Sequence, residues 1–100
     1  MYTNVIFQSY YNTSKLKVFV EKYELNFDDQ GLASIALVEG QQYNVYCFAS
    51  GKTGSYYELL ILEPKNIPLH IFRTIDSSNE DRGKHAFTIS MKKEYAFSFS

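Results

Sequence analysis

The sequence predicts an all-β protein: an antiparallel two-sheet β-sandwich of about eight short strands, forming one domain over residues 1–100. Apolar and polar residues alternate with a period of two along most of the chain, whereas no long segment carries apolar residues at helical spacing. The nine Tyr and eight Phe favour pleated, half-buried strands. The connections are too short for crossover helices, so neighbouring strands are expected to be antiparallel.

Turn-forming residues bound each strand in order. In the first part of the chain these are residues 12–14, 28–31, 39–40 and 50–55, which are rich in Asn, Asp, Gly and Ser. The resulting candidate strands are residues 2–10, 15–25, 32–38 and 42–49.

The later turns are residues 64–66, 76–83 and 92–93, and both prolines fall outside strand centres, as strand geometry requires. The candidate strands between them are residues 56–63, 68–75, 85–91 and 94–99.

One apolar face of each strand is predicted to form the core. In chain order these faces are Val5 and Phe7; Leu16, Val18 and Val20; Ala33, Ile35 and Leu37; Tyr43, Val45 and Cys47; Tyr57, Leu59 and Ile61; Leu69 and Ile71; Phe87 and Ile89; and Tyr95, Phe97 and Phe99. Several strands are apolar on the opposite face as well, notably through Tyr46 with Phe48 and Leu60 with Leu62. These second faces must contact water, a partner molecule or one another.

The two parts of the chain resemble each other at a fixed offset, which places residues 29–31 on residues 81–83 and Tyr43 on Tyr95. Core faces stay in register between these anchors, as expected if the sandwich consists of two similar four-strand halves. Shared hairpin chemistry and period-two patterning give the same similarity without duplication. Both explanations stay open at this point.

Residues 28–49 contain an Asp-Asp-Gln-Gly turn, an alternating strand, a turn at Gly40, and the sequence Tyr43-Asn44-Val45-Tyr46. This segment resembles a strand pair of transthyretin-like, carboxypeptidase-regulatory-type β-sandwich domains. The resemblance implies a sandwich fold and a non-catalytic accessory or assembly role. Gly40 suits a positive φ, and Tyr43 is expected to bury its ring and direct its hydroxyl at a turn backbone.

Charge and composition disfavour several classes of partner. Ten basic and eleven acidic residues give a net charge of -1, so the sequence does not predict nucleic-acid binding. It also predicts no membrane insertion, because no apolar run approaches the roughly 20 residues of a spanning helix and no secretory leader precedes the first strand. The single Cys47 fits a cytoplasmic protein, with an extracellular location open if a leader has been removed.

No catalytic, cofactor-binding or metal-binding residue is predicted. His70 and His85 lie within strand patterns, and Cys47 shares a core face, so a nucleophile–base pair is not indicated. Lys52 follows Gly51 without the earlier glycine or the helix of a phosphate-binding loop. The acidic turns at 28–29 and 76–81 lack the ligand spacing of a calcium loop, although oxygen-rich turns leave that reading open.

The remaining feature is a surplus of aromatic side chains beyond what a core of this size holds. The residues predicted to form a contact surface are Tyr10, Tyr46, Phe48 and Tyr56. We therefore expect a non-enzymatic protein-interaction or assembly module that self-associates or docks on a protein through an aromatic sheet face or an edge strand. The alternative is a carbohydrate-binding module with a tyrosine stacking platform.

Overall fold

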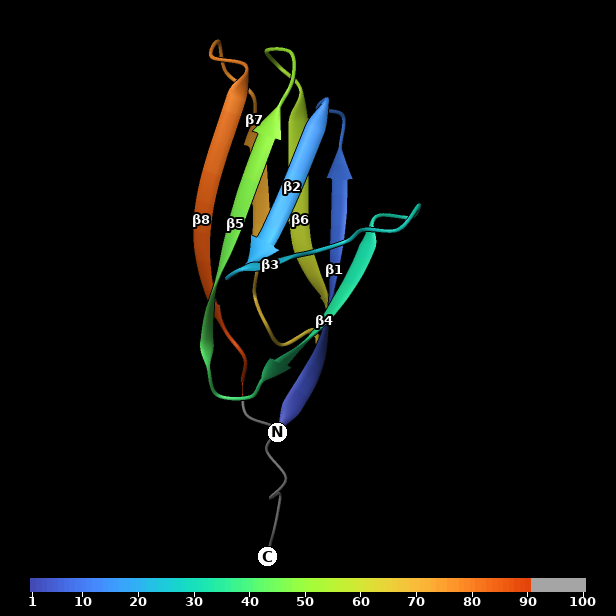
Figure 1. The fold of residues 1–100 in the computed structure, drawn as a ribbon, viewed down its shortest axis with the longest axis vertical. Coiled ribbons are helices and arrows are strands. Elements are labelled where there is room, and N and C mark those ends of the chain that lie inside the picture. The colour runs from blue at the N-terminus through green and yellow to red at the C-terminus, as the bar shows by residue number, and fades with distance from the viewer. Residues whose placement is uncertain (91–100) are drawn as a thin grey trace, which may run out of the picture.

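The computed structural model describes residues 1–90 and confirms the all-β prediction, with eight strands and no helix among those residues (Figure 1). The strands are β1 (Tyr2–Tyr11), β2 (Lys15–Val20), β3 (Tyr23–Glu24), β4 (Leu32–Val38), β5 (Gln42–Ser50), β6 (Tyr56–Glu63), β7 (His70–Thr74) and β8 (Glu80–Thr88).

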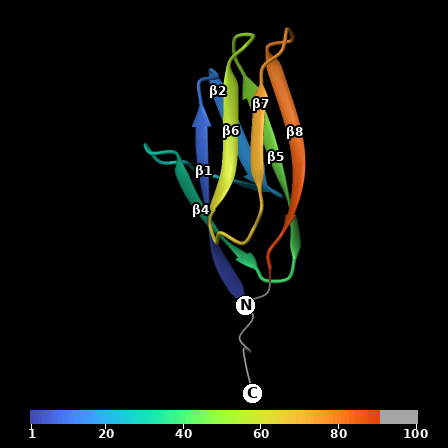
Figure 2. The same cartoon turned by 180° about the vertical axis from the view of Figure 1, so that it is seen from behind.

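The strands form two four-stranded antiparallel sheets, ordered β4-β1-β6-β7 and β3-β2-β5-β8. The two sheets face each other as the layers of a sandwich, as the opposite views in Figures 1 and 2 show. The sheets are not the two halves of the chain. β2 lies in the sheet opposite β1, whereas its counterpart at the fixed offset, β7, pairs with β6, the counterpart of β1.

The core lies between the sheets and uses the predicted faces. All predicted core residues up to Ile89 are buried, except that Leu16, Ile35 and Tyr43 are partly buried against the others. The rings of Phe7 and Phe87 meet edge to face at 6.0 Å and so connect the two layers. The core also includes residues that the alternation did not mark, namely Leu25, Ala49, Ile67 and Ile75. Tyr95, Phe97, Phe99 and the predicted strand 94–99 lie outside the described residues.

The predicted strand 15–25 is wrong in its second part. Glu21 has a positive φ of 54° and begins a tight turn, after which β3 pairs with β2 for only two residues. The predicted start of the strand 85–91 is also wrong, because β8 pairs with β5 from Ser50 opposite Glu80 onward. Its first inward positions include Asp81 and Gly83, whose polar or small character resembles a turn rather than a core face.

The turns at Gly31 and Gly40 have the positive φ values that favour glycine, 81° and 84°. Tyr43 behaves as expected from the sequence: its half-buried ring lies against the core, and its hydroxyl accepts a hydrogen bond of 2.8 Å from the backbone N–H of Val38. This contact fixes the end of β4 to the start of β5.

Candidate functional site

The four predicted contact residues divide between opposite sides of the sandwich. Tyr57 and Leu59 point into the core, so Tyr56 and Glu58, at alternate positions of β6, point outward. Tyr10 pairs with Glu58 and lies on the same outer side. Tyr46 and Phe48 alternate with the buried Cys47 and lie on the outside of the other sheet. We call these outer surfaces face A, formed by Tyr10, Tyr56, Glu58, Leu60, Leu62, His70 and Phe72, and face B, formed by Lys15, Lys17, Phe19, Tyr46, Phe48, Arg82 and Lys84.

Face A groups aromatic rings around one carboxylate. Glu58 is the direct cross-strand partner of both Tyr10 and Phe72. The rings of Tyr56 and Phe72 stack with their centres 5.7 Å apart. Tyr10 is 51% exposed and Phe72 is 58% exposed, so their apolar surfaces meet solvent. The sequence prediction missed Phe72, whose only signal was its position between inward-facing Ile71 and Arg73 in a short strand.

The carboxylate of Glu58 is paired with His70, with 2.5 Å between Oε2 and Nε2. His70 is the more exposed partner, at 63% of its side chain. The Glu58–His70 pair therefore lies beside the rings of Tyr10 and Phe72 on face A.

A hollow of about 380 Å³ adjoins Tyr10 and Tyr56 and is lined by Tyr11 and the turn of residues 28–31. Two side-chain hydrogen bonds hold this turn: the Oδ1 of Asp28 accepts from the backbone N–H groups of Gln30 (2.9 Å) and Leu32 (3.0 Å). Two of the predicted contact tyrosines thus line a single polar hollow.

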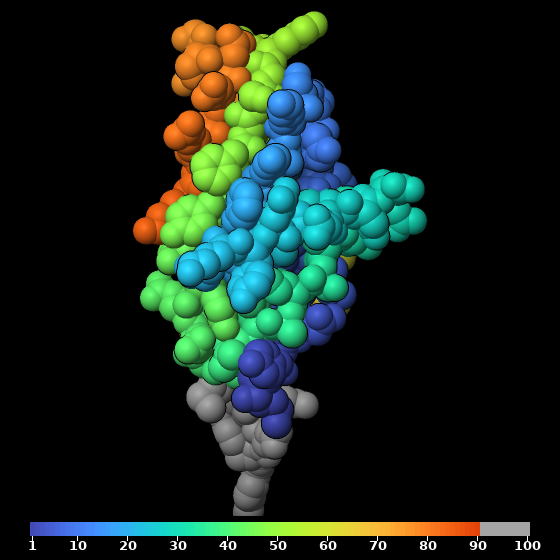
Figure 3. Space-filling model, in the orientation of Figure 1, coloured from blue at the N-terminus to red at the C-terminus, as the bar shows by residue number. Residues whose placement is uncertain are grey.

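Face B is different in character, because its rings lie among basic side chains. The rings of Phe19 and Phe48 meet edge to face at 5.9 Å. The guanidinium carbon of Arg82 lies 6.0 Å from the centre of the Phe48 ring, and the Lys84 Nζ lies 5.9 Å from that of Tyr46. Figure 3 looks onto this side of the molecule, where β2, β5 and β8 form a continuous surface.

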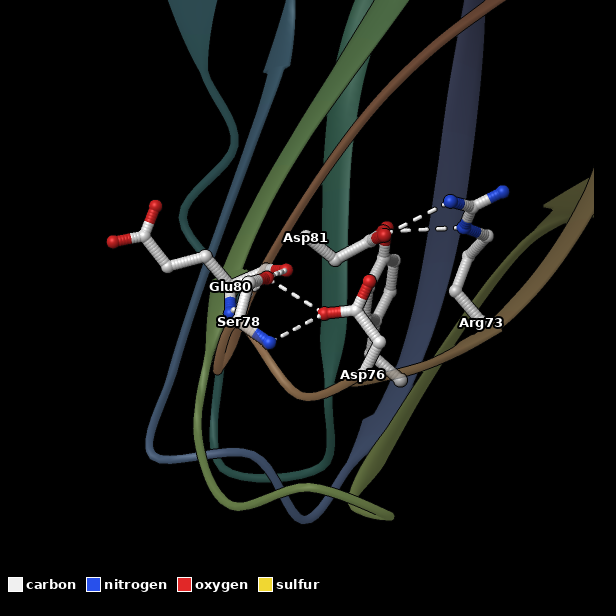
Figure 4. A network of polar contacts seen from close by, with 6 residues as sticks. Arg73, Asp76, Ser78, Glu80 and Asp81 are labelled. Carbon is white, nitrogen blue, oxygen red and sulfur yellow. Dashed lines mark hydrogen bonds and ion pairs between the residues drawn. The ribbon is translucent and has the colours of Figure 1, made fainter.

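A partly buried polar network closes the edge of the sandwich between β7 and β8. Asp81 accepts a 2.6 Å hydrogen bond from the hydroxyl of Tyr57, which is fully buried. The guanidinium of Arg73 donates two hydrogen bonds to the same carboxylate, at 2.8 and 3.1 Å (Figure 4). Arg73 and Asp81 belong to different sheets, so this network ties the two layers together.

The network shifts the pKa values of its members. Hydrogen bonding from Arg73 is the main cause that holds the pKa of Asp81 below its ordinary range, despite partial burial. Burial, with the hydrogen bond to Asp81, raises the pKa of Tyr57. Burial likewise raises the pKa of the Cys47 thiol to about 12, so the thiol stays protonated at neutral pH.

In the acidic turn before β8, the carboxylate of Asp76 accepts hydrogen bonds from within the same turn. The Oδ1 of Asp76 accepts hydrogen bonds from the backbone N–H of Ser78 (2.9 Å) and from its hydroxyl (2.6 Å), as Figure 4 shows. These bonds, the side-chain one foremost, lower the pKa of Asp76. No group of three or more potential metal ligands occurs within residues 1–90.

The two histidines are not brought together. His70 lies on face A, whereas His85 lies on β8, and its Nε2 is buried with no hydrogen-bond partner among the described residues. Over the same residues, no helix has the length and apolar character of a membrane span.

The fold defines the molecule as an antiparallel β-sandwich protein with two outward aromatic faces. Comparison with models of protein families, with curated proteins and with solved structures finds no match to this chain. The transthyretin-like resemblance of residues 28–49 therefore stays a prediction, and the chemistry of the two faces is what indicates a function.

Proposed function

We propose that this chain is a non-enzymatic interaction module that associates with protein through face A, with a second copy of itself as the first partner to test. The observation that carries the proposal is the exposure of Tyr10 and Phe72 beside Tyr56 and the half-exposed Leu62, on a sheet face that the core does not use. Contiguous apolar and aromatic groups of this kind are typical of interfaces.

The polar groups at the centre of face A favour a specific contact over non-specific hydrophobic association. The Glu58–His70 pair lies among the rings, so it supplies hydrogen-bonding groups inside an apolar surround. Tyr and Phe also lose little conformational freedom when they are buried in an interface. An accessory or assembly role of this type agrees with the resemblance of residues 28–49, and the single buried Cys47 supports a reducing, cytoplasmic location.

Sedimentation velocity across a wide concentration range tests the proposal. We expect a concentration-dependent dimer, which Phe72→Ser abolishes because it removes the most exposed ring of face A. The matched control is Phe48→Ser, which removes a ring from the opposite side and should leave the dimer intact. A wild-type protein that stays monomeric at millimolar concentration, or a dimer lost equally in both variants, contradicts a contact through face A.

A second candidate is carbohydrate binding in the hollow beside face A. The specific observation is that Tyr10, Tyr11 and Tyr56 line one hollow together with the polar turn of residues 28–31. Flat rings stack on sugar faces, and carboxylate and amide groups accept or donate hydrogen bonds to sugar hydroxyls. Binding on a broad glycan array that Tyr10→Ala removes would support this function, and silence across the array would exclude it.

A further inference from the structure

Face B brings together basic side chains that are far apart in the sequence. Lys15 and Lys17 lie on β2, whereas Arg82 and Lys84 lie on β8 at the other side of β5. Neighbouring strands are about 4.8 Å apart, so all four cations lie within a few strand spacings of one another. The net charge of the whole chain does not reveal this local concentration.

The strand register places the cations on both sides of the rings. One row across the sheet reads Lys17, Phe48, Arg82, and the next reads Phe19, Tyr46, Lys84. Each row therefore contains at least one ring and one cation in direct cross-strand contact. The rings and cations become neighbours only through strand pairing, because no residue of a row is adjacent in sequence to another residue of the same row.

The acidic residues of this side lie at its margins. Glu24, on the edge strand β3, is the direct cross-strand partner of Phe19, and Glu80 begins β8 opposite Ser50 at the end of the ladder. A hollow of about 210 Å³ lies between Lys15, Lys17, Phe48 and Arg82, with Glu80 and Asp81 also on its wall. The carboxylate of Asp81 is already bonded to Arg73, so the cations dominate the accessible charge of the hollow.

We propose that face B binds single-stranded nucleic acid. The lysines and arginine contact phosphates, and unpaired bases stack on the rings of Tyr46 and Phe48. A sheet face with central rings and flanking cations provides both requirements of such ligands, backbone neutralisation and flat stacking surfaces. This inference uses the opposite side from face A and is independent of the proposed protein contact.

Two other anionic partners fit face B less well. A duplex hides the faces of its bases, so it would leave the rings of Tyr46 and Phe48 unused. An acidic polypeptide satisfies the cations, but its Asp and Glu side chains do not stack on the rings as every nucleobase does. Arg82 and Lys84, which now lie over the rings, have flexible side chains that can move to phosphates or cover a stacked base.

Fluorescence anisotropy with labelled oligothymidylate and oligouridylate of about 16 nucleotides tests the proposal, because that length covers the site of one small β domain. We expect saturable binding that weakens with salt. Phe48→Ala should reduce affinity about tenfold or more, the scale of one lost stacking contact. Lys17→Gln should reduce the slope of log affinity against log salt by about 0.7, as expected for one phosphate contact on a single strand.

Matched controls keep the result specific to face B. Phe72→Ala removes a ring from face A, and Lys65→Gln removes an exposed charge from the loop after β6; neither should change oligonucleotide affinity. Circular dichroism of each variant checks that the sandwich is folded. Because Lys17 is exposed, its variant remains informative even if Phe48→Ala unfolds the protein.

Three outcomes would overturn the proposal. The first is absence of oligonucleotide binding at low salt. The second is equal affinity for duplex and single strand together with no effect of Phe48→Ala, which indicates charge attraction alone. The third is binding of polyglutamate in place of oligonucleotide, which assigns the face to an acidic polypeptide.

Discussion

Asp81 is the residue whose replacement best tests how the two sheets are held together. Its carboxylate is bonded to Arg73 of the opposite sheet and to the buried hydroxyl of Tyr57. Asp81→Ala removes the contacts with both residues at once. We expect it to destabilise the fold although it opens no space in the apolar core.

The magnitude follows from the two contacts taken separately. The side chain of Arg73 is 47% exposed, so water and salt screen its pairing and the pair contributes only about 0.5 kcal/mol. Leaving the Tyr57 hydroxyl buried without an acceptor costs about 2 kcal/mol. Asp81→Ala should therefore lower the free energy of unfolding by about 2–3 kcal/mol, and the Tm by roughly 10–20 °C for a domain of this size.

A double-mutant cycle separates this explanation from a general loss of packing. Tyr57→Phe should destabilise the wild type by about 1.5 kcal/mol, because it removes a hydrogen bond to a charged acceptor. In the Asp81→Ala background the same change should be neutral or stabilising, because it removes the unpaired hydroxyl. Urea unfolding followed by tyrosine fluorescence and circular dichroism measures all four proteins. Equal costs of Tyr57→Phe in both backgrounds would refute the reasoning.

Three further predictions concern single residues. Because the pKa of Asp81 is lower in the folded protein, its contribution to stability is fully present above about pH 5 and is lost as pH falls through the ordinary value of about 3.9 toward the folded pKa. The free energy of unfolding, measured as the pH is lowered, should therefore fall less for Asp81→Ala than for the wild type. The thiol of Cys47, with its pKa raised to about 12, should not react with a thiol reagent at pH 8 until denaturant unfolds the chain, and rapid labelling of the folded protein would contradict its burial. Gly31→Ala should lower the Tm more than Gly54→Ala does. Both positions have positive φ, but a Cβ at Gly31 would lie 2.5 Å from the carbonyl oxygen of Ser9, whereas a Cβ at Gly54 would meet open space. Equal Tm values for the two variants would count against this explanation.

Most of the fold is readable from the sequence because one physical rule dominates it. A residue that alternates toward the core must be apolar, so Val18, Val45 and Leu59 mark their strands directly. The rule fails where a strand borders the open edge of the sandwich. There β8 carries Asp81 and Gly83 at inward positions, since a polar network rather than apolar packing closes that edge.

The candidate surfaces are harder to predict from the sequence, because they depend on strand register and sheet order rather than on the local pattern of residues. Tyr10 and Tyr56 become neighbours only through the pairing of β1 with β6, and Lys17 and Arg82 only through the shared neighbour β5. Alternation shows that a side chain points outward, but it does not show which of the two outer faces it joins. The outward orientation of Tyr10, Tyr46, Phe48 and Tyr56 could therefore be predicted, whereas their division between the two faces could not.

Strand propensity alone explains why a β protein has many Tyr and Phe residues, and it is the simplest alternative to a functional role for both faces. Propensity acts on each position separately, so it scatters aromatic residues over outward positions without regard to their neighbours. Here Tyr10 and Phe72 lie on either side of the same carboxylate, Glu58, whereas Tyr46 has a lysine beside it across the sheet. The rings therefore have different charged neighbours on the two faces: a carboxylate paired with His70 on face A, and the basic side chains of Lys17, Arg82 and Lys84 beside Phe48 and Tyr46 on face B. The two proposed contacts require this difference. The same separation means that substitutions on the two faces should act additively, since the full thickness of the core lies between them.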